Sequence, residues 1–288
     1  MRADEVRGPT HPWHEVGAGI FVRRYPFLDQ TIGAILGRER ALVIDTRATA
    51  IQARELIQDL RQLTRLPWVV ANTHVHFDHA FGNASFRPCE IWSHAGCAEA
   101  LRLHGPAQRE NVVRWVPDLA DELNATPLDP PDRTFEDFVE LDLGGRVAEL
   151  RHLGRGHTDH DVVVRSPDTG IVFAGDLVEQ GAPPGFEDSF PLDWPATLGM
   201  LLDLADGVVV PGHGEPVSRD FVENQLTEVA FLAETARRAW PELRDSGHDP
   251  RGHAPHPLVD EAAHYLGWPS EPVHAALGRG LAQAAGHL

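Results

Sequence analysis

Four side chains that can bind a metal ion or move a proton stand within six residues of one another. They are His74, His76, Asp78 and His79, in the segment WVVANTHVHFDH. His74 and His76 are two residues apart, so in an extended chain they point to the same side and can hold one ion. Asp78 and His79 follow as the chain turns toward a helix, where they can reach a second ion beside the first. This His-x-His-x-Asp-His motif is far more specific than a lone histidine pair, and it predicts a metal site.

Three further candidate ligands follow predicted strands later in the chain. They are His157 in VAELRHLGRGHT, Asp176 in IVFAGD and His213 in GVVVPGH. Because strand ends converge along one edge of a sheet in layered α/β proteins, we expect these residues to meet the first four. Glycines flank all three, and glycine permits tight turns and close backbone approach. Five imidazoles and two carboxylates are enough for two metals; this set suits Zn²⁺, although iron and manganese also accept nitrogen and oxygen ligands.

Short apolar strands alternating with helices must position these residues. Near-continuous apolar runs of strand length predict strands buried on both faces, at Ala41–Asp45, Trp68–Asn72, Asp161–Ser166, Gly170–Asp176 and Gly207–Gly212. Thr49, three residues before Gln52, predicts the start of a helix by a capping box. A second, longer helix is predicted to begin near Ser218 and to stop before Pro241.

Two segments have a composition of their own. Residues 105–142 carry five prolines and a dense set of acids, and they form either a solvated connection between two halves of the fold or a lid or wall over a site. Residues 245–288 hold six histidines and predict a loop with short helices that packs on the main domain. We expect those dispersed histidines to be surface residues.

The composition excludes several kinds of chemistry. The 288 residues include 25 basic and 43 acidic ones, with a net charge of −18, and every basic residue is an arginine. Without lysine there is no Schiff-base enzyme and no phosphate loop ending in Gly-Lys-Ser/Thr. The negative charge argues against nucleic acid as a partner, because binding to phosphates needs cations. The expected partner is a small-molecule substrate; the oligomeric state stays open.

The sequence also bears on location. No apolar run approaches the roughly 18–20 residues that span a membrane, so no membrane partner is expected. The N-terminal segment has no apolar stretch of the kind found in secretory signals. Only Cys89 and Cys97 could form a disulfide, and two thiols in such a chain are expected to be reduced. These features predict a cytoplasmic protein.

The segments HVHFDH, GRGHT, AGD and PGHG, in this order and spacing, resemble the metallo-β-lactamase-fold hydrolase superfamily over about residues 14–235. The resemblance implies an α/β fold, a four-layer αββα sandwich with a dinuclear metal site along one edge. We expect this domain over residues 1–240 and a helical extension packed on it over residues 241–288. By the same resemblance, the ligands of the first metal are His74, His76 and His157, those of the second are Asp78, His79 and His213, and Asp176 bridges both.

Two details favour one branch of this superfamily. Asp176 is present and neither cysteine falls at a ligand position, which favours the glyoxalase II, lactonase and thioesterase-like branch over dedicated β-lactamases. The expected enzyme binds two Zn²⁺ per chain, and a hydroxide shared by the two cations attacks an ester, thioester, lactone or amide carbonyl. Asp78, beyond ligation, is expected to orient the water or shuttle its proton.

Three alternatives remain open. The motifs also resemble persulfide dioxygenases, which use a single iron and consume oxygen. β-Lactamase activity is a further candidate. The third alternative is a non-catalytic effector that keeps the fold and the metals in order to bind a small molecule.

Residues around the metal site are predicted less directly. Phe186, Phe190 and Trp194 follow Asp176 and form either the wall of an apolar substrate pocket or a hydrophobic plug under a loop. His160 is a further candidate for substrate contact, with a supporting or surface role as the alternative. The residues expected to hold the second ring nitrogens of the ligands are Asp45, Thr73 and Thr158.

Overall fold

A computed structural model describes residues 11–250 and 252–288 of the chain. The first ten residues, where the sequence predicts no secretory signal, and Arg251 lie outside the described residues. Within the described ranges, no helix combines the length and the apolar composition needed to cross a membrane.

The first half of the chain builds one side of a β-sandwich. Its strands, in spatial order, are β1 (His14–Gly17), β2 (Ile20–Tyr25), β3 (Gln30–Leu36), β4 (Ala41–Ile44), β5 (Trp68–Ala71), β6 (Ile91–His94) and β7 (Arg133–Phe135). Neighbours from β1 to β4 pair antiparallel, and those from β4 to β7 pair parallel. The central strands β4 and β5 are almost wholly buried, as their continuous apolar runs predict.

The second half of the chain builds the other side. Its strands are β8 (Phe138–Asp142), β9 (Val147–His152), β10 (Val162–Ser166), β11 (Ile171–Glu179) and β12 (Val209–His213). All neighbours pair antiparallel except β11 and β12, which are parallel. The two halves join at a single residue pair, His213 with Gln30, so the end of β12 lies beside the start of β3.

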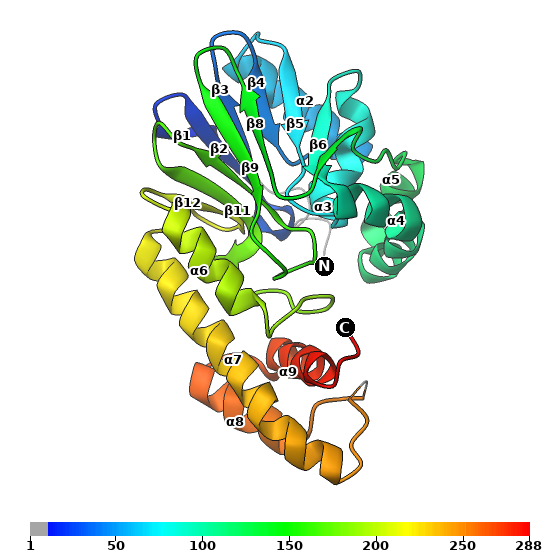
Figure 1. Ribbon diagram of the computed structural model, residues 1–288. Helices are drawn as coiled ribbons and strands as arrows, with labels where there is room; N and C mark the ends of the chain where they lie inside the picture. The colour runs from blue at the N-terminus through cyan, green and yellow to red at the C-terminus, as the bar shows by residue number, and fades with distance from the viewer. Residues whose placement is uncertain (1–10, 251) are drawn as a thin grey trace.

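The two halves face each other across a shared apolar core. Side chains from both sides meet in it, among them Ile35, Leu42, Ile44, Leu150, Val164 and Phe173. Helices cover the outer faces (Figure 1). This is the four-layer αββα arrangement, and the predicted fold class is confirmed.

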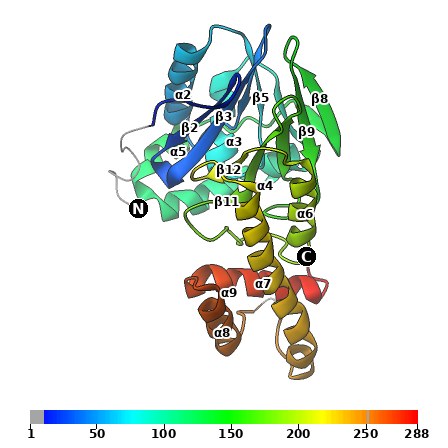
Figure 2. The same ribbon diagram turned by 90° about the vertical axis from the view of Figure 1, so that its left-hand side faces the viewer.

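On the outer face of the first half, α2 (Ala50–Leu63) buries Leu56 and Leu60 against the strands. On the second half, α6 (Trp194–Leu204) and α7 (Arg219–Asp245) do the same. The C-terminal helices α8 (His256–Leu266) and α9 (Ser270–Ala284) pack beside the part of α7 that extends beyond the sheets (Figure 2). The predicted C-terminal helical extension is therefore present.

The end predicted for the long helix is wrong, because α7 continues through Pro241 to Asp245. Proline removes one backbone hydrogen bond from a helix. Pro241 is exposed, so water can reach the carbonyl left without a partner. Trp240 and Leu243 pack against the C-terminal core, and this packing keeps the chain helical. The helix crosses residue 240, and the division at that residue stays a prediction.

Residues 105–142 contain more helix and strand than a solvated connection or a lid requires. They contain the second half of α4 (Ala95–Trp115), with Pro106 inside it, and α5 (Ala120–Ala125), followed by β7 and β8. Leu119 and Leu123 are buried against α4. The segment is thus mainly a packed part of the domain.

Candidate metal centre

The motif HVHFDH occupies the loop after β5 and the short helix α3 (Phe77–Ala80). Asp45, directly after β4, fixes this loop. Its carboxylate accepts hydrogen bonds from the backbone N–H and the hydroxyl of Thr73, both at 2.8 Å, and from Nδ1 of His79 at 2.8 Å. Asp45 has a φ of 68°, a conformation uncommon outside glycine that surrounding contacts must hold. These three bonds provide such contacts.

The other three predicted ligands come from the second half of the sandwich. His157 lies in the loop after β9, Asp176 lies within β11, and His213 ends β12. Because β11 and β12 run parallel, Asp176 and His213 reach the same edge. Gly212 makes this approach sterically possible, since a Cβ atom there would lie 1.8 Å from Oδ1 of Asp176.

All seven predicted ligands meet at this edge, in two groups. Within each group one potential ligand atom per residue lies within 4.8 Å of the others. The groups are His74, His76, His157 and Asp176, and Asp78, His79 and His213. Neither contains a cysteine. They match the two sets that the family resemblance implies, with Asp176 placed in the first.

Asp176 also contacts the second group. Its Oδ2 is 3.2 Å from Nε2 of His213 in the second group, as well as 3.6 Å from Nε2 of His74 in the first. Its Oδ1 is 3.3 Å from Nε2 of His79. This carboxylate therefore lies where a ligand shared by two ions would have to be.

Each of the five imidazoles uses its other ring nitrogen for a hydrogen bond. Three acceptors are side chains: Oγ1 of Thr73 for His74 at 3.0 Å, Oδ2 of Asp188 for His76 at 3.0 Å and Oδ2 of Asp45 for His79 at 2.8 Å. Two are backbone carbonyls: that of Gly185 for His157 at 3.1 Å and that of Leu28 for His213 at 2.8 Å. A carbonyl only accepts, so the ring nitrogen facing it carries the proton and the opposite nitrogen presents a lone pair. Imidazoles bind metals in this form.

The unpaired atoms of the cluster fit a cation. Nε2 of His74 and Oδ1 of Asp176 are buried without a hydrogen-bond partner, which is costly in a protein interior. Nε2 of His157 and Nδ1 of His76 approach to 2.8 Å. A divalent ion bound by the first group would satisfy the ring nitrogens of His74, His76 and His157. The mixed nitrogen and oxygen set suits Zn²⁺ and also iron or manganese.

Burial and mutual charge determine the protonation of the cluster. Burial raises the pKa of the Asp176 carboxyl, but His213, His79 and the other imidazoles bring it well below its usual range. Asp78 has a lowered pKa for the same reasons. Burial lowers the pKa of His157 to about 4, so this ring is neutral near pH 7. The carboxylates around the other rings outweigh burial and raise the pKa of His76 to about 9, that of His213 to about 10 and that of His79 well above its usual range. A metal ion must therefore displace protons from these three rings when it binds.

Two acidic residues that support the predicted ligands were not predicted from the sequence. Asp188 binds His76 from a loop 112 residues away, and no spacing links the two. Oε1 of Glu179 accepts the N–H of Gly185 at 2.8 Å, and the carbonyl of Gly185 orients His157. Burial raises the pKa of Glu179 to about 8. An acid inside the apolar run of β11 was a signal for Glu179, whereas nothing marked Asp188.

Two of the three predicted supporting residues contact ligands, namely Asp45 and Thr73. Thr158 does not, because its N–H and hydroxyl donate to Asp161 at 2.8 Å and 2.7 Å. Burial raises the pKa of Asp161 to about 8. Thr158 therefore shapes the loop after His157 and does not orient a ligand directly.

The structure separates the four predicted substrate contacts into two pairs. Phe186 and Trp194 are buried, with ring centroids 5.1 Å apart, and Trp194 packs edge-on against His157 at 5.8 Å. Neither ring is accessible, so both are placed as a hydrophobic plug under the loop would be. His160 and Phe190 line a cavity of about 450 Å³ beside the centre.

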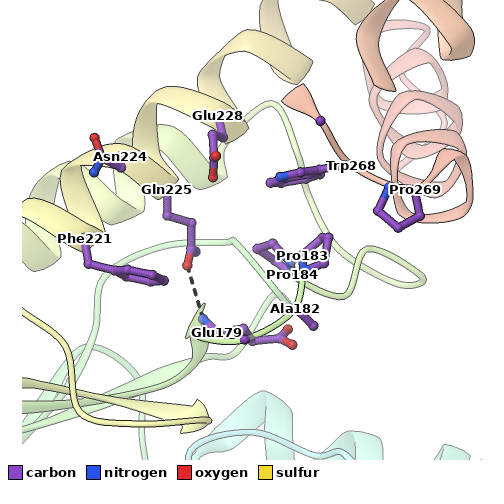
Figure 3. A pocket seen from close by; sticks show the side chains of 12 residues that line it. Glu179, Ala182, Pro183, Pro184, Phe221, Asn224, Gln225, Glu228, Trp268 and Pro269 are labelled. Carbon is purple, nitrogen blue, oxygen red and sulfur yellow. Dashed lines mark hydrogen bonds between the residues drawn. The ribbon is translucent and has the colours of Figure 1, made fainter. Parts of the chain in front are cut away.

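A second cavity, of about 440 Å³, lies between the loop after β11, α7 and the turn before α9. Its lining combines apolar residues such as Pro183, Phe221 and Trp268 with polar ones such as Gln225 and Glu228 (Figure 3). The backbone N–H of Glu179 donates to Gln225 of α7 at 3.2 Å on one side of this cavity. The cavity therefore lies where the C-terminal helices meet the strand that carries Asp176.

The sequence of the chain is similar to those of known proteins. Residues 25–213 match the sequence model of the metallo-beta-lactamase superfamily. The human acyl-coenzyme A thioesterase MBLAC2 is 28% identical over 236 residues, covering 69% of this chain and 79% of that protein. The type 2 metallo-beta-lactamase of Bacteroides fragilis is 24% identical, covering 66% of this chain and 71% of that protein.

Solved structures show a similar fold. A metallo-beta-lactamase from Pontibacter korlensis superimposes with a TM-score of 0.62 at 20% identity, covering 77% of this chain and 99% of that one. The DIM-1 metallo-beta-lactamase does so with a TM-score of 0.59 at 16% identity, again covering 77% and 99%.

Proposed function

The chain belongs to the metallo-beta-lactamase superfamily, and from this premise we propose that it is a metal-dependent hydrolase that cleaves a thioester or ester with two zinc ions bound. The seven-residue cluster, with one ring nitrogen of each imidazole turned inward, carries the proposal. The thioesterase relatives support a thioester among the carbonyl compounds considered, and they imply a small-molecule substrate.

In this proposal both groups of the cluster hold metal. One ion would bind His74, His76 and His157, the other would bind Asp78, His79 and His213, and Asp176 would be shared. Bound zinc would supply a water whose pKa is lowered to about 7 and a Lewis acid for the carbonyl oxygen.

Asp78 is the chain's own candidate for moving a proton. Its carboxylate is 4% exposed, and its Oδ2 is 3.4 Å from Nε2 of both His79 and His213. Its backbone carbonyl accepts a hydrogen bond from Gln30, which ties α3 to β3. As an anion held in place by its neighbours in the second group, Asp78 would orient the attacking water and accept its proton.

The test measures metal and turnover on the same protein. The chain is stripped with a chelator and reloaded with Zn²⁺, and its metal content is determined by elemental analysis. Hydrolysis is then measured on a thioester, an ester, a lactone and a β-lactam. We expect about two metals per chain and turnover of the thioester or the ester.

Matched histidine variants make the test specific. His74→Ala should abolish turnover and lower the metal content, whereas His264→Ala, at an exposed position of α8, should change neither. Fewer than one metal per chain after reloading, or no hydrolysis of any compound in the panel, would falsify the proposal. Oxygen uptake with a persulfide by an iron-loaded protein would replace it with the dioxygenase alternative.

A further inference from the structure

Three histidines of the C-terminal helical extension lie close together, outside the metal centre. His253 lies between α7 and α8, His256 is the first residue of α8, and His274 lies on α9. Nδ1 of His253 is 2.9 Å from Nε2 of His274, and we call these two residues the C-terminal histidine pair. His253 and His256 are exposed and His274 is half-buried, so the pair is open to ions in solution.

Direct contact between two imidazole nitrogens is otherwise confined to the metal centre. In the part of the chain that the structure describes, ring nitrogens of two histidines come within hydrogen-bond distance in three places. Two of these contacts join His79 to His213 at 3.3 Å and His76 to His157 at 2.8 Å, and each lies within one group of proposed metal ligands. The C-terminal histidine pair is the third. It therefore repeats a contact that is characteristic of the ligand rings in this protein.

The distance within the C-terminal histidine pair fits two ligands of one metal ion. When Zn–N bonds are about 2.0–2.1 Å long and meet at roughly 90–110°, the two nitrogens lie about 2.8–3.4 Å apart. The observed 2.9 Å falls within this range. A hydrogen bond between the two rings has the same length, so a further observation has to distinguish the two interpretations.

His256 is that observation, because it adds a third imidazole beside the pair. Its ring centroid is 6.4 Å from that of His274. A hydrogen bond between His253 and His274 uses one nitrogen of each ring and needs no third ring. A zinc ion takes about four ligands. Since the side chain of His256 is exposed, rotation can turn one of its nitrogens toward the pair, and water can fill the positions that remain.

We propose that His253 and His274 form a further metal site, which binds one divalent ion such as Zn²⁺, with His256 as a third candidate ligand. The ion would join the segment before α8 to α9 and so cross-link the C-terminal extension. Two or three exposed imidazoles and water hold an ion less firmly than a buried set of seven ligands. Removal of free zinc should therefore empty this site before the metal centre.

The test measures zinc binding on the full chain. Wild type and variants are dialysed to equilibrium against excess free Zn²⁺, and the bound zinc is determined by elemental analysis. We expect wild type to hold about one ion per chain more than His274→Ala or His253→Ala. His274→Gln should lose the ion as well, because glutamine can still hydrogen-bond to His253 but does not replace an imidazole ligand. His264→Ala, at an exposed position of α8, should hold as much zinc as wild type.

A second measurement locates the ion. Diethyl pyrocarbonate modifies accessible imidazole nitrogens, and mass spectrometry reports the extent at each histidine. Excess Zn²⁺ should protect His253 and His274 and leave His264 reactive. Equal zinc content in wild type and His274→Ala overturns the inference, as do a full complement of zinc in His274→Gln and an unchanged reactivity of the pair. Because each variant is compared with wild type, the difference of one ion is independent of the metal content of the centre and of any hydrolysis.

Discussion

The orientation of each imidazole depends on one oxygen atom behind it. Three of these oxygens belong to side chains and two to the backbone, at Leu28 and Gly185. The backbone acceptors cannot be changed by substitution, so the side chains are where the arrangement can be tested. Asp188 is the most informative of them, because it comes from a loop 112 residues away from His76 in the sequence.

Replacing Asp188 should weaken metal binding without removing a ligand. Asp188→Ala leaves Nε2 of His76 without its acceptor, and loss of such a partner typically lowers metal affinity roughly 10–100-fold. Asp188→Asn keeps an oxygen acceptor but not the charge, so its effect should be smaller. Competition with a chromogenic chelator measures both affinities. Glu187→Gln, at the exposed neighbouring position, serves as the control, and equal affinities for Asp188→Ala and wild type would contradict the assignment.

Asp161 should make stability depend on pH. Burial raises its pKa to about 8 in the folded chain, from an ordinary value of 3.8. Between these values the folded state holds a proton that the unfolded state lacks, so this contribution falls as pH rises, by at most about 1.4 kcal/mol per pH unit. Urea denaturation between pH 5 and pH 8 should show wild type losing stability relative to Asp161→Asn. Parallel profiles for the two proteins, or the same divergence in the exposed control Asp203→Asn, would contradict this.

Residue types and spacing are enough to predict the ligands but not their supports. The seven candidate ligands could be proposed because each ends or follows a strand predicted from the sequence, with glycine or another candidate beside it. Asp45 and Thr73 could be proposed because they border the same loop. Asp188 could not, since a tertiary contact alone brings it to His76, and burial of Phe186 and Trp194 depends on packing that a local pattern does not contain.

At the scale of elements, the parallel pair β11 and β12 sets the centre of the site. Gly212→Ala should displace Asp176, because the added Cβ would lie 1.8 Å from its Oδ1. A displacement near 1 Å at reacting groups can cost roughly 100-fold in rate, so we expect a loss of that size in turnover, with reduced metal content. Elemental analysis and thioester hydrolysis measure the two effects.

The matched control for Gly212 lies on α6. A Cβ at Gly199 meets nothing within 4 Å. Gly199→Ala should therefore leave metal content unchanged and raise the free energy of unfolding by about 0.5–1 kcal/mol, since alanine favours a helix over glycine. If Gly212→Ala binds metal like Gly199→Ala, the close approach is not required for the site.

The accuracy of element prediction follows the strength of the local signal. Continuous apolar runs placed all five predicted strands, and Thr49 caps α2 by accepting from the N–H of Gln52. Proline is a weaker signal in long helices, because packing on both sides of Pro241 outweighs one lost hydrogen bond. The acidic composition of residues 105–142 likewise concealed two packed helical segments.

At the scale of the whole molecule, α9 connects the C-terminal helices to the metal centre. Arg279 of α9 donates from Nε to the carbonyl of Ser189 and from Nη2 to that of Asp188, both at 2.8 Å. Gln283 donates to Asp193 and accepts from the N–H of Leu192. The loop that orients His76 is thus held from outside by a helix about 90 residues away in sequence. The C-terminal extension therefore supports the site as well as the core.

Removing this connection should weaken metal binding through Asp188. Arg279→Met keeps the length of the side chain but loses both hydrogen bonds, so the loop gains freedom and His76 is held less firmly. Each lost bond is worth about 1 kcal/mol, and part of that loss should appear as a fall in metal affinity of roughly 3–10-fold, smaller than for Asp188→Ala. Arg244→Met, which loses only a surface ion pair with Asp245, is the control. In the double variant with Asp188→Ala, Arg279→Met should change metal affinity little further, because Arg279 acts on His76 through the position of Asp188. Additive losses of affinity would show that α9 affects the metal centre through other residues.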